Sequence, residues 1–175
     1  MKVSIKIILQ IVFIGLLFTS CKDEKTSKDT HNAKGVLTSR DFFVNGKLIH
    51  SISFYPNGAK AVEKLFDETT GLMSGPYVEF YDDGSIKKKG KAAEGQFEDT
   101  MFVYYRQNRL QEIGIYKNGK KNGRLLFYHF NGNIGAAGMY VNDSMDGKWT
   151  IYDDNGFEIG TNEYVKGNLI SGAGE

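Results

Sequence analysis

One spacing constrains this chain more than any other feature: residues of the same kind recur every 24 positions over its C-terminal two thirds. Two of the columns that share this period are Gly84, Asn108, Gly132, Gly156 and, four residues earlier, the aromatics Phe80, Tyr104, Tyr128, Tyr152. Three further glycine-rich columns are Gly71, Gly95, Gly119, Asp143, Gly167, then Gly75, Asp99, Gly123, Gly147, and finally Gly90, Gly114, Gly138. A fixed period of this size is typical of repeat proteins, in which each unit stacks on the next.

One unit has the sequence pattern of a β-hairpin. Apolar residues fill positions 125–128, the pair Asn131-Gly132 follows, and a second apolar stretch occupies positions 134–140. An Asn-Gly pair between two apolar runs is a strong hairpin signal, because such turns need residues at positive φ. Asn108 replaces glycine in one copy, and asparagine tolerates the left-handed region best after glycine. We therefore predict an all-β domain of repeated antiparallel β-hairpins that form an elongated twisted sheet.

The strand positions also predict two faces, since successive side chains on a strand point to opposite sides. One face carries Tyr77, Met101, Leu125, Trp149, and the other carries Val78, Phe102, Leu126, Thr150. Both sets are largely apolar, so the sequence leaves open which face is buried. A lone hairpin is marginal in water, and the copies must therefore cover one another.

The N-terminus is typical of an exported protein. Residues 1–20 combine two lysines with an apolar run at 7–18, which is short for a membrane span and is the layout of a signal peptide. Ser20 precedes Cys21, the single cysteine, and this arrangement resembles the lipobox of bacterial lipoproteins. That resemblance implies cleavage between Ser20 and Cys21 and acylation of Cys21, which would anchor the protein to a membrane.

Residues 21–35 are predicted to form the lipidated cysteine and a flexible tether, because this stretch is polar and lacks aromatics. Its start, residues 21–24, resembles a surface-export signal of some Bacteroidota, with an ordinary linker as the alternative. The repeat domain is then expected over residues 36–175. The protein is expected on the bacterial cell envelope, at the outer membrane, facing the periplasm or the surface.

Residues 147–156, with the sequence GKWTIYDDNG, fit the pattern G-x-[WYF]-x-x-[YF]-x-x-x-G. Other copies depart from it, as at Asp99 and Asn108. Over residues 41–170 the chain resembles proteins with variant MORN (membrane occupation and recognition nexus) repeats. Bacterial chains of this kind are often labelled antitoxins of the YwqK type. The resemblance implies a β-repeat scaffold, and it raises the second hypothesis that the protein inhibits a partner toxin.

No residue pattern predicts catalysis. Removal of residues 1–20 leaves 20 basic and 21 acidic side chains, a net charge of −1. This charge lacks the positive excess that is typical of proteins that bind nucleic acid. The three histidines lack zinc-site spacing, no G-x-S-x-G elbow occurs, and no phosphate loop is present. Asp82-Asp83 and Asp153-Asp154 flank turns and are attributed to turn chemistry. We predict a non-catalytic binding or scaffold protein with no cofactor or metal.

Function is expected where the copies differ. The candidate interaction residues are Lys87, Lys88, Lys89, Lys91, His129 and Trp149. The lysines could meet anionic headgroups or glycans, but protection of an exposed strand from aggregation is favoured. His129 is interpreted as a rim residue, and Trp149 as either a core residue or an exposed anchor. The aromatic column at Phe80 could line a peptide or sugar groove, with packing between hairpins favoured. The expected partner is a protein or an envelope glycan, and the oligomeric state is not predicted.

Overall fold

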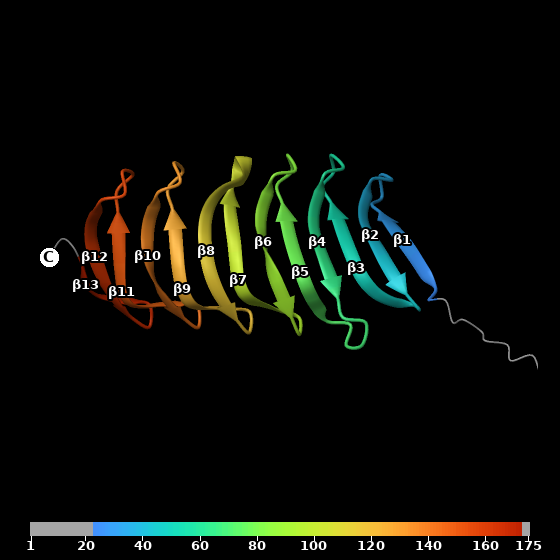
Figure 1. Cartoon of the computed structure of the whole chain (residues 1–175). Helices are drawn as coiled ribbons and strands as arrows, with labels where there is room; N and C mark the ends of the chain where they lie inside the picture. Colours follow the sequence, from blue (N-terminus) through green and yellow to red (C-terminus); the bar gives the residue numbers. More distant parts are fainter. Residues whose placement is uncertain (1–22, 173–175) are drawn as a thin grey trace, which may run out of the picture.

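The computed structural model describes residues 23–172, and within them 13 antiparallel strands form one open sheet whose strand order is the chain order. The strands are β1 (Lys25–His31), β2 (Leu37–Val44), β3 (Lys47–Phe54), β4 (Lys60–Phe66), β5 (Met73–Phe80), β6 (Ile86–Ala93), β7 (Gln96–Tyr105), β8 (Arg109–Lys117), β9 (Lys120–Tyr128), β10 (Ile134–Val141), β11 (Ser144–Tyr152), β12 (Glu158–Val165) and β13 (Asn168–Gly172). The sheet is elongated, with β1 and β13 at opposite ends (Figure 1). The predicted all-β hairpin repeat is confirmed.

The turns alternate between two long edges of the sheet. Apart from the longer loop at residues 67–72 between β4 and β5, the lower edge in Figure 1 carries two-residue turns in which both residues have positive φ, as at Asn118 (51°) and Gly119 (76°). This is the type I′ pattern, whose twist matches that of the flanking strands. The Gly119 amide also donates to the carbonyl of Phe97, two strands back, at 2.9 Å. Each lower turn of this kind therefore fixes its own hairpin against the preceding one.

The upper edge carries longer turns that contain the glycine column. At residues 129–133 the Gly132 amide donates to the His129 carbonyl at 2.9 Å, and Gly132 has φ 95°. Asn108 has φ 57°, as its residue type predicts. Its turn is nevertheless different, because Arg106–Asn108 form a short 3-10 helix in which Gln107 also has positive φ, at 66°.

A column of buried side chains forms the core. Met101, Leu125 and Trp149 are 0%, 0% and 2% exposed, and they define the packed face of the sheet. Each lies over a glycine of the preceding hairpin, namely Gly90, Gly114 and Gly138, where an added Cβ would overlap it. We call the opposite surface, which carries Val78, Phe102 and Leu126, the open face. The exposed-anchor interpretation of Trp149 is wrong, because the indole fills the space that Gly138 leaves.

The predicted tether is also wrong in part. Lys25–His31 form β1, which pairs with β2 although all seven side chains are exposed. Backbone pairing holds this strand, together with two hydrogen bonds from the Arg40 guanidinium to the Asp29 carboxylate, both 2.7 Å long. The tether was predicted because this stretch lacks the apolar side chains that a buried strand would need. That criterion missed β1 because polar contacts and backbone pairing hold this strand. The sheet thus includes Lys25–His31, which the prediction assigned to the tether and not to the domain expected from residue 36.

Within residues 23–172 no helix has the length and apolar character that crossing a membrane requires. The proposed signal peptide, the Ser20–Cys21 cleavage point and the acylation of Cys21 lie outside these described residues.

Candidate functional sites

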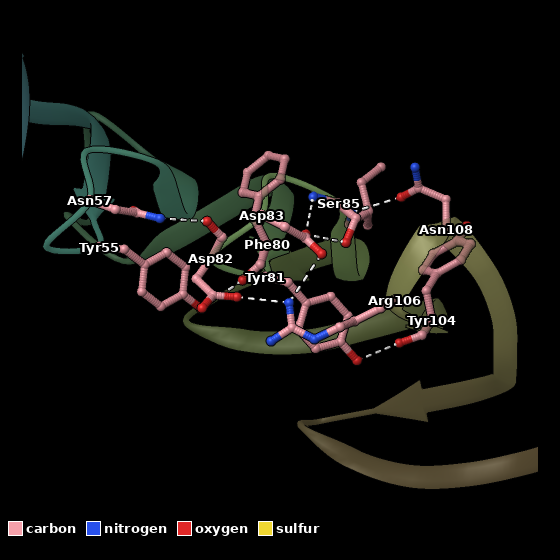
Figure 2. A network of polar contacts seen from close by, with 11 residues as sticks. Tyr55, Asn57, Phe80, Tyr81, Asp82, Asp83, Ser85, Tyr104, Arg106 and Asn108 are labelled. Carbon is pink, nitrogen blue, oxygen red and sulfur yellow. Dashed lines mark hydrogen bonds and ion pairs between the residues drawn. The ribbon is translucent and has the colours of Figure 1, made fainter.

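A ladder of side-chain hydrogen bonds joins the upper turns (Figure 2). In four of the upper turns one side chain bonds to a backbone carbonyl in the next hairpin: Tyr55 to Phe80 (2.8 Å), Tyr81 to Tyr104 (2.8 Å), Tyr105 to Tyr128 (3.2 Å) and His129 to Tyr152 (2.9 Å). The accepting carbonyls belong to the predicted aromatic column, whose own side chains are half-buried. The sequence contains this donor column at a spacing of 24–26 residues, but its bonding partners could not be predicted from it.

His129 is a member of this ladder and not an independent site. It occupies the position that tyrosine holds in earlier copies, and Nε2 must carry a proton to donate to the Tyr152 carbonyl. Its other ring nitrogen, Nδ1, lies 3.1 Å from an Asp154 carboxylate oxygen. Both ring nitrogens therefore face partners within the scaffold.

The ladder borders an open hollow of about 390 Å³ that is lined by residues of three successive upper turns, and we call it the edge hollow. Its lining residues are Tyr55, Pro56, Asn57, Tyr81, Asp82 and Arg106. The Arg106 guanidinium lies 4.7 Å from the Tyr81 ring centroid and donates from Nη1 to Asp82 (2.7 Å) and Asp83 (3.1 Å). Figure 2 shows these side chains converging from three turns that are distant in sequence.

Aspartates at the turns accept hydrogen bonds from nearby backbone amides, as their turn role predicts. Asp83 accepts from the hydroxyl and the amide of Ser85, and Asp153 accepts from the amides of Asn155 and Phe157. The Ser85 hydroxyl lowers the pKa of Asp83, the Phe157 amide lowers that of Asp153, and the Thr70 amide lowers that of Asp67. Over residues 23–172, no three His, Cys, Asp or Glu side chains group as a metal site would require.

These pKa shifts predict that the protein loses stability in acid. A carboxyl whose pKa is lower in the folded state binds fewer protons there than in the unfolded chain, so its contribution exists above the unfolded value and disappears as pH falls through the folded one. We expect the urea midpoint to fall between pH 5 and pH 2 and to fall less for the triple variant Asp67→Asn, Asp83→Asn, Asp153→Asn. Asparagine keeps the acceptor oxygen without titrating. An equal loss in both proteins would contradict this assignment.

The lysine strip lies on β6, which pairs with β5 on one side and β7 on the other. The interpretation that these lysines protect a free strand edge is therefore wrong, because β6 has none. Lys87 donates to Glu79 at 2.7 Å. The Lys88 ammonium lies 4.2 Å from the Phe97 ring centroid on the packed face, where burial lowers its pKa. Both residues already have partners within the sheet.

An ion pair also lies on the packed face, in which one carboxylate oxygen of Glu112 is bonded to Lys121 and the other, Oε1, is buried without a hydrogen-bond partner among the described residues. Glu112 is 7% exposed and accepts a hydrogen bond from Lys121 at 2.8 Å. Burial, followed by the charge of Glu112, raises the pKa of Tyr116 to about 12. Burial, followed by the charge of Glu79, raises that of Tyr77 to about 12 as well. The packed face thus holds neutral phenols and a bonded ion pair.

Lys89 and Lys91 differ from the other two lysines because they point to the open face. They border a hollow of about 360 Å³, the open-face hollow, whose lining includes the apolar Pro76, Val78 and Phe102 and the acidic Asp99. Among the residues that the structure describes, no ion pair joins either ammonium to a carboxylate. The matching positions in later copies are Ile113, Ala137, Thr161 for Lys89 and Ile115, Met139, Glu163 for Lys91.

No protein-family model and no curated protein matches the chain. Among solved structures it is similar to one titled "Crystal Structure of TarM", with a TM-score of 0.32 and 12% identity. The matched region covers 68% of this chain and 20% of that chain, so this chain spans about a fifth of the length of that protein. A TM-score this low indicates neither a common fold nor a common function.

Proposed function

We propose that this protein is a lipid-anchored, non-catalytic binding module of the bacterial cell envelope. The observation that carries the proposal is the open-face hollow, where Lys89 and Lys91 flank an apolar floor in only one copy of an otherwise regular sheet. A repeat scaffold has no structural need at such a place for two ammonium groups that lack a carboxylate partner among residues 23–172. Departures from a regular pattern that also create a hollow are therefore the best candidates for a binding role.

Charge and polarity indicate the ligand. Lys89 and Lys91 are two residues apart on one strand, so their Cα atoms are separated by roughly 6.6 Å. The Lys89 ammonium lies 5.5 Å from the Phe102 ring centroid and 5.4 Å from that of Tyr104. This arrangement suits an acidic side chain next to an apolar one. We propose as occupant an acidic, partly apolar segment of a partner envelope protein.

The position of β1 supports a location close to the membrane. Only residues 22–24 separate Cys21 from the first strand residue, Lys25. Four residue steps span at most about 14 Å even when fully extended. An acylated Cys21 would thus keep the β1 end of the sheet within about 14 Å of the lipid surface, where it meets partners held in the same membrane.

The anchor has a direct test. Replacing Cys21 by alanine removes the thiol that the acyl chain needs, and we expect the protein to move from the membrane fraction to the soluble fraction. Metabolic labelling with a fatty-acid analogue should label the wild-type protein and leave the variant unlabelled. Label on the Cys21→Ala protein would refute the anchor.

The binding role is tested separately in the full-length protein with a photo-crosslinking residue at Thr100, beside the open-face hollow. We expect a discrete cross-linked partner that is lost, about tenfold or more, in the double variant Lys89→Gln, Lys91→Gln. The matched control is Lys117→Gln, Lys120→Gln, which removes two exposed lysines at the lower edge. Equal cross-linking in both double variants would contradict a role for the open-face hollow.

A further inference from the structure

We propose that the edge hollow is a carbohydrate site that takes a neutral pyranose unit of a glycan. The proposal is independent of the open-face hollow. The walls of the edge hollow are the rings of Tyr55 and Tyr81, and each hydroxyl donates a 2.8 Å hydrogen bond to a backbone carbonyl. These two bonds fix the ring orientations and leave for a ligand the ring faces that the Arg106 guanidinium, stacked on Tyr81, does not cover. The C–H faces of a pyranose ring suit such rigid aromatic surfaces.

Unused polar groups lie beside these rings. Within residues 23–172, the hydrogen bonds of the Arg106 guanidinium are made by Nη1, and the bond to the Asp82 carboxylate is accepted by Oδ1. Nη2 and Nε of Arg106 and Oδ2 of Asp82 therefore remain free, and the two side chains are 54% and 57% exposed. A guanidinium donor next to a carboxylate acceptor matches vicinal hydroxyls, which both donate and accept.

The site is also held in place before a ligand arrives. Arg106 is fixed by its stacking on Tyr81 and by its bonds to Asp82 and Asp83, and the Asn57 amide donates to the Asp82 carbonyl at 2.7 Å. Side chains already ordered lose little conformational entropy on binding. One guanidinium faces two carboxylates, so the hollow carries no excess of positive charge. A neutral sugar therefore suits it better than a phosphate or a sulfate.

The ladder of hydrogen bonds continues along the upper edge beyond the edge hollow. Successive hairpins repeat every two strands, which is roughly 9.6 Å. Tyr105 and His129 continue the ladder, and Phe130 and Phe157 in the next turns are 54% and 72% exposed. A glycan lying along this edge would meet aromatic rings at regular intervals. We therefore expect oligosaccharides to bind better than single sugars.

The test is binding of detergent-solubilised full-length protein to immobilised neutral oligosaccharides of two to six pyranose units, with sulfated and phosphorylated counterparts. We expect retention of at least one neutral oligosaccharide. Titration calorimetry with that sugar should show about tenfold weaker binding for Arg106→Ala, and unchanged binding for the control Lys89→Gln, Lys91→Gln.

Circular dichroism shows whether each variant is folded. If Arg106→Ala is not, Arg106→Gln takes its place, because it keeps the side-chain length without the charged fork. Three results would overturn the proposal: no neutral sugar retained by the wild type, binding of anionic sugars alone, or equal affinity in the folded Arg106 variant. None of these outcomes bears on the open-face hollow, which has its own test.

Discussion

Replacing Gly138 by valine is expected to lower the free energy of unfolding by more than about 3 kcal/mol, because a side chain there displaces a buried tryptophan. A Cβ at this position would overlap the indole of Trp149, which is 2% exposed. Either the indole leaves its place or the two hairpins separate. A domain is stable by only about 5–15 kcal/mol, so a large part of the protein's stability is at risk.

Gly132→Val is the matched comparison. Gly132 has φ 95° and no neighbouring atom within 4 Å of an added Cβ, so its cost is backbone strain alone, about 1–3 kcal/mol. Urea denaturation followed by circular dichroism compares the two variants. Trp149 is the single tryptophan, and its emission should shift to longer wavelength in Gly138→Val only. A larger effect for Gly132→Val, or unchanged emission in Gly138→Val, would contradict the packing described for Trp149.

Truncation of Leu125 to alanine is expected to cost about 2–5 kcal/mol, the range for a buried leucine. Leu125 is 0% exposed and lies over Gly114, so alanine leaves a cavity at the centre of the packed face. In a domain of this size the melting temperature should fall by about 5–15 °C. Thermal unfolding followed by circular dichroism measures this change.

Leu126→Ala is the control for that prediction. Leu126 is the next residue on the same strand, points to the open face and is only half-buried. Its truncation removes the same atoms from a less enclosed position, so we expect less than half the effect of Leu125→Ala. Equal effects would mean that both faces are equally packed, contrary to the burial of Met101, Leu125 and Trp149.

The repeat and its turns could be predicted from the sequence because local geometry selects residue types. A turn position with positive φ accepts glycine or asparagine, and Gly84, Asn108, Gly132 and Gly156 all adopt it. The 24-residue period then places every hairpin. Asp99, at φ 66°, occupies a glycine position in the same left-handed conformation.

The buried face could not be predicted, because it depends on a contact between strands. Both faces carry apolar side chains, and the decisive relation is between a glycine and a large residue eleven positions later, such as Gly90 and Met101. The lysines of β6 posed the same difficulty. Their charge was plain from the sequence, and strand alternation alone places Lys88 and Lys89 on opposite faces. Their place between two paired strands, and the face to which each belongs, were not plain from the sequence.

The edge hollow was missed for a related reason. Its walls come from turns whose residues are about 25 positions apart, and Pro56 and Arg106 belong to no repeated column. A site built from unlike residues of neighbouring copies leaves no periodic signal. The open-face hollow was found in part, since Lys89 and Lys91 were candidates, but its apolar floor depends on the pairing of β5, β6 and β7.

The most direct test of the account is deletion of one 24-residue unit, because the central claim is that this hairpin is the building block that carries both hollows. Removing residues 120–143 takes out β9 and β10 and joins Gly119 to Ser144, which leaves residues 55–106 in place. We predict a protein with a β-sheet circular dichroism spectrum and cooperative thermal unfolding at a reduced melting temperature. Deleting the 12 residues 130–141 removes β10 alone, puts later turns on the wrong edge and should abolish cooperative unfolding. If the 24-residue deletion unfolds the protein as completely as the 12-residue deletion, the hairpin repeat is not the structural unit.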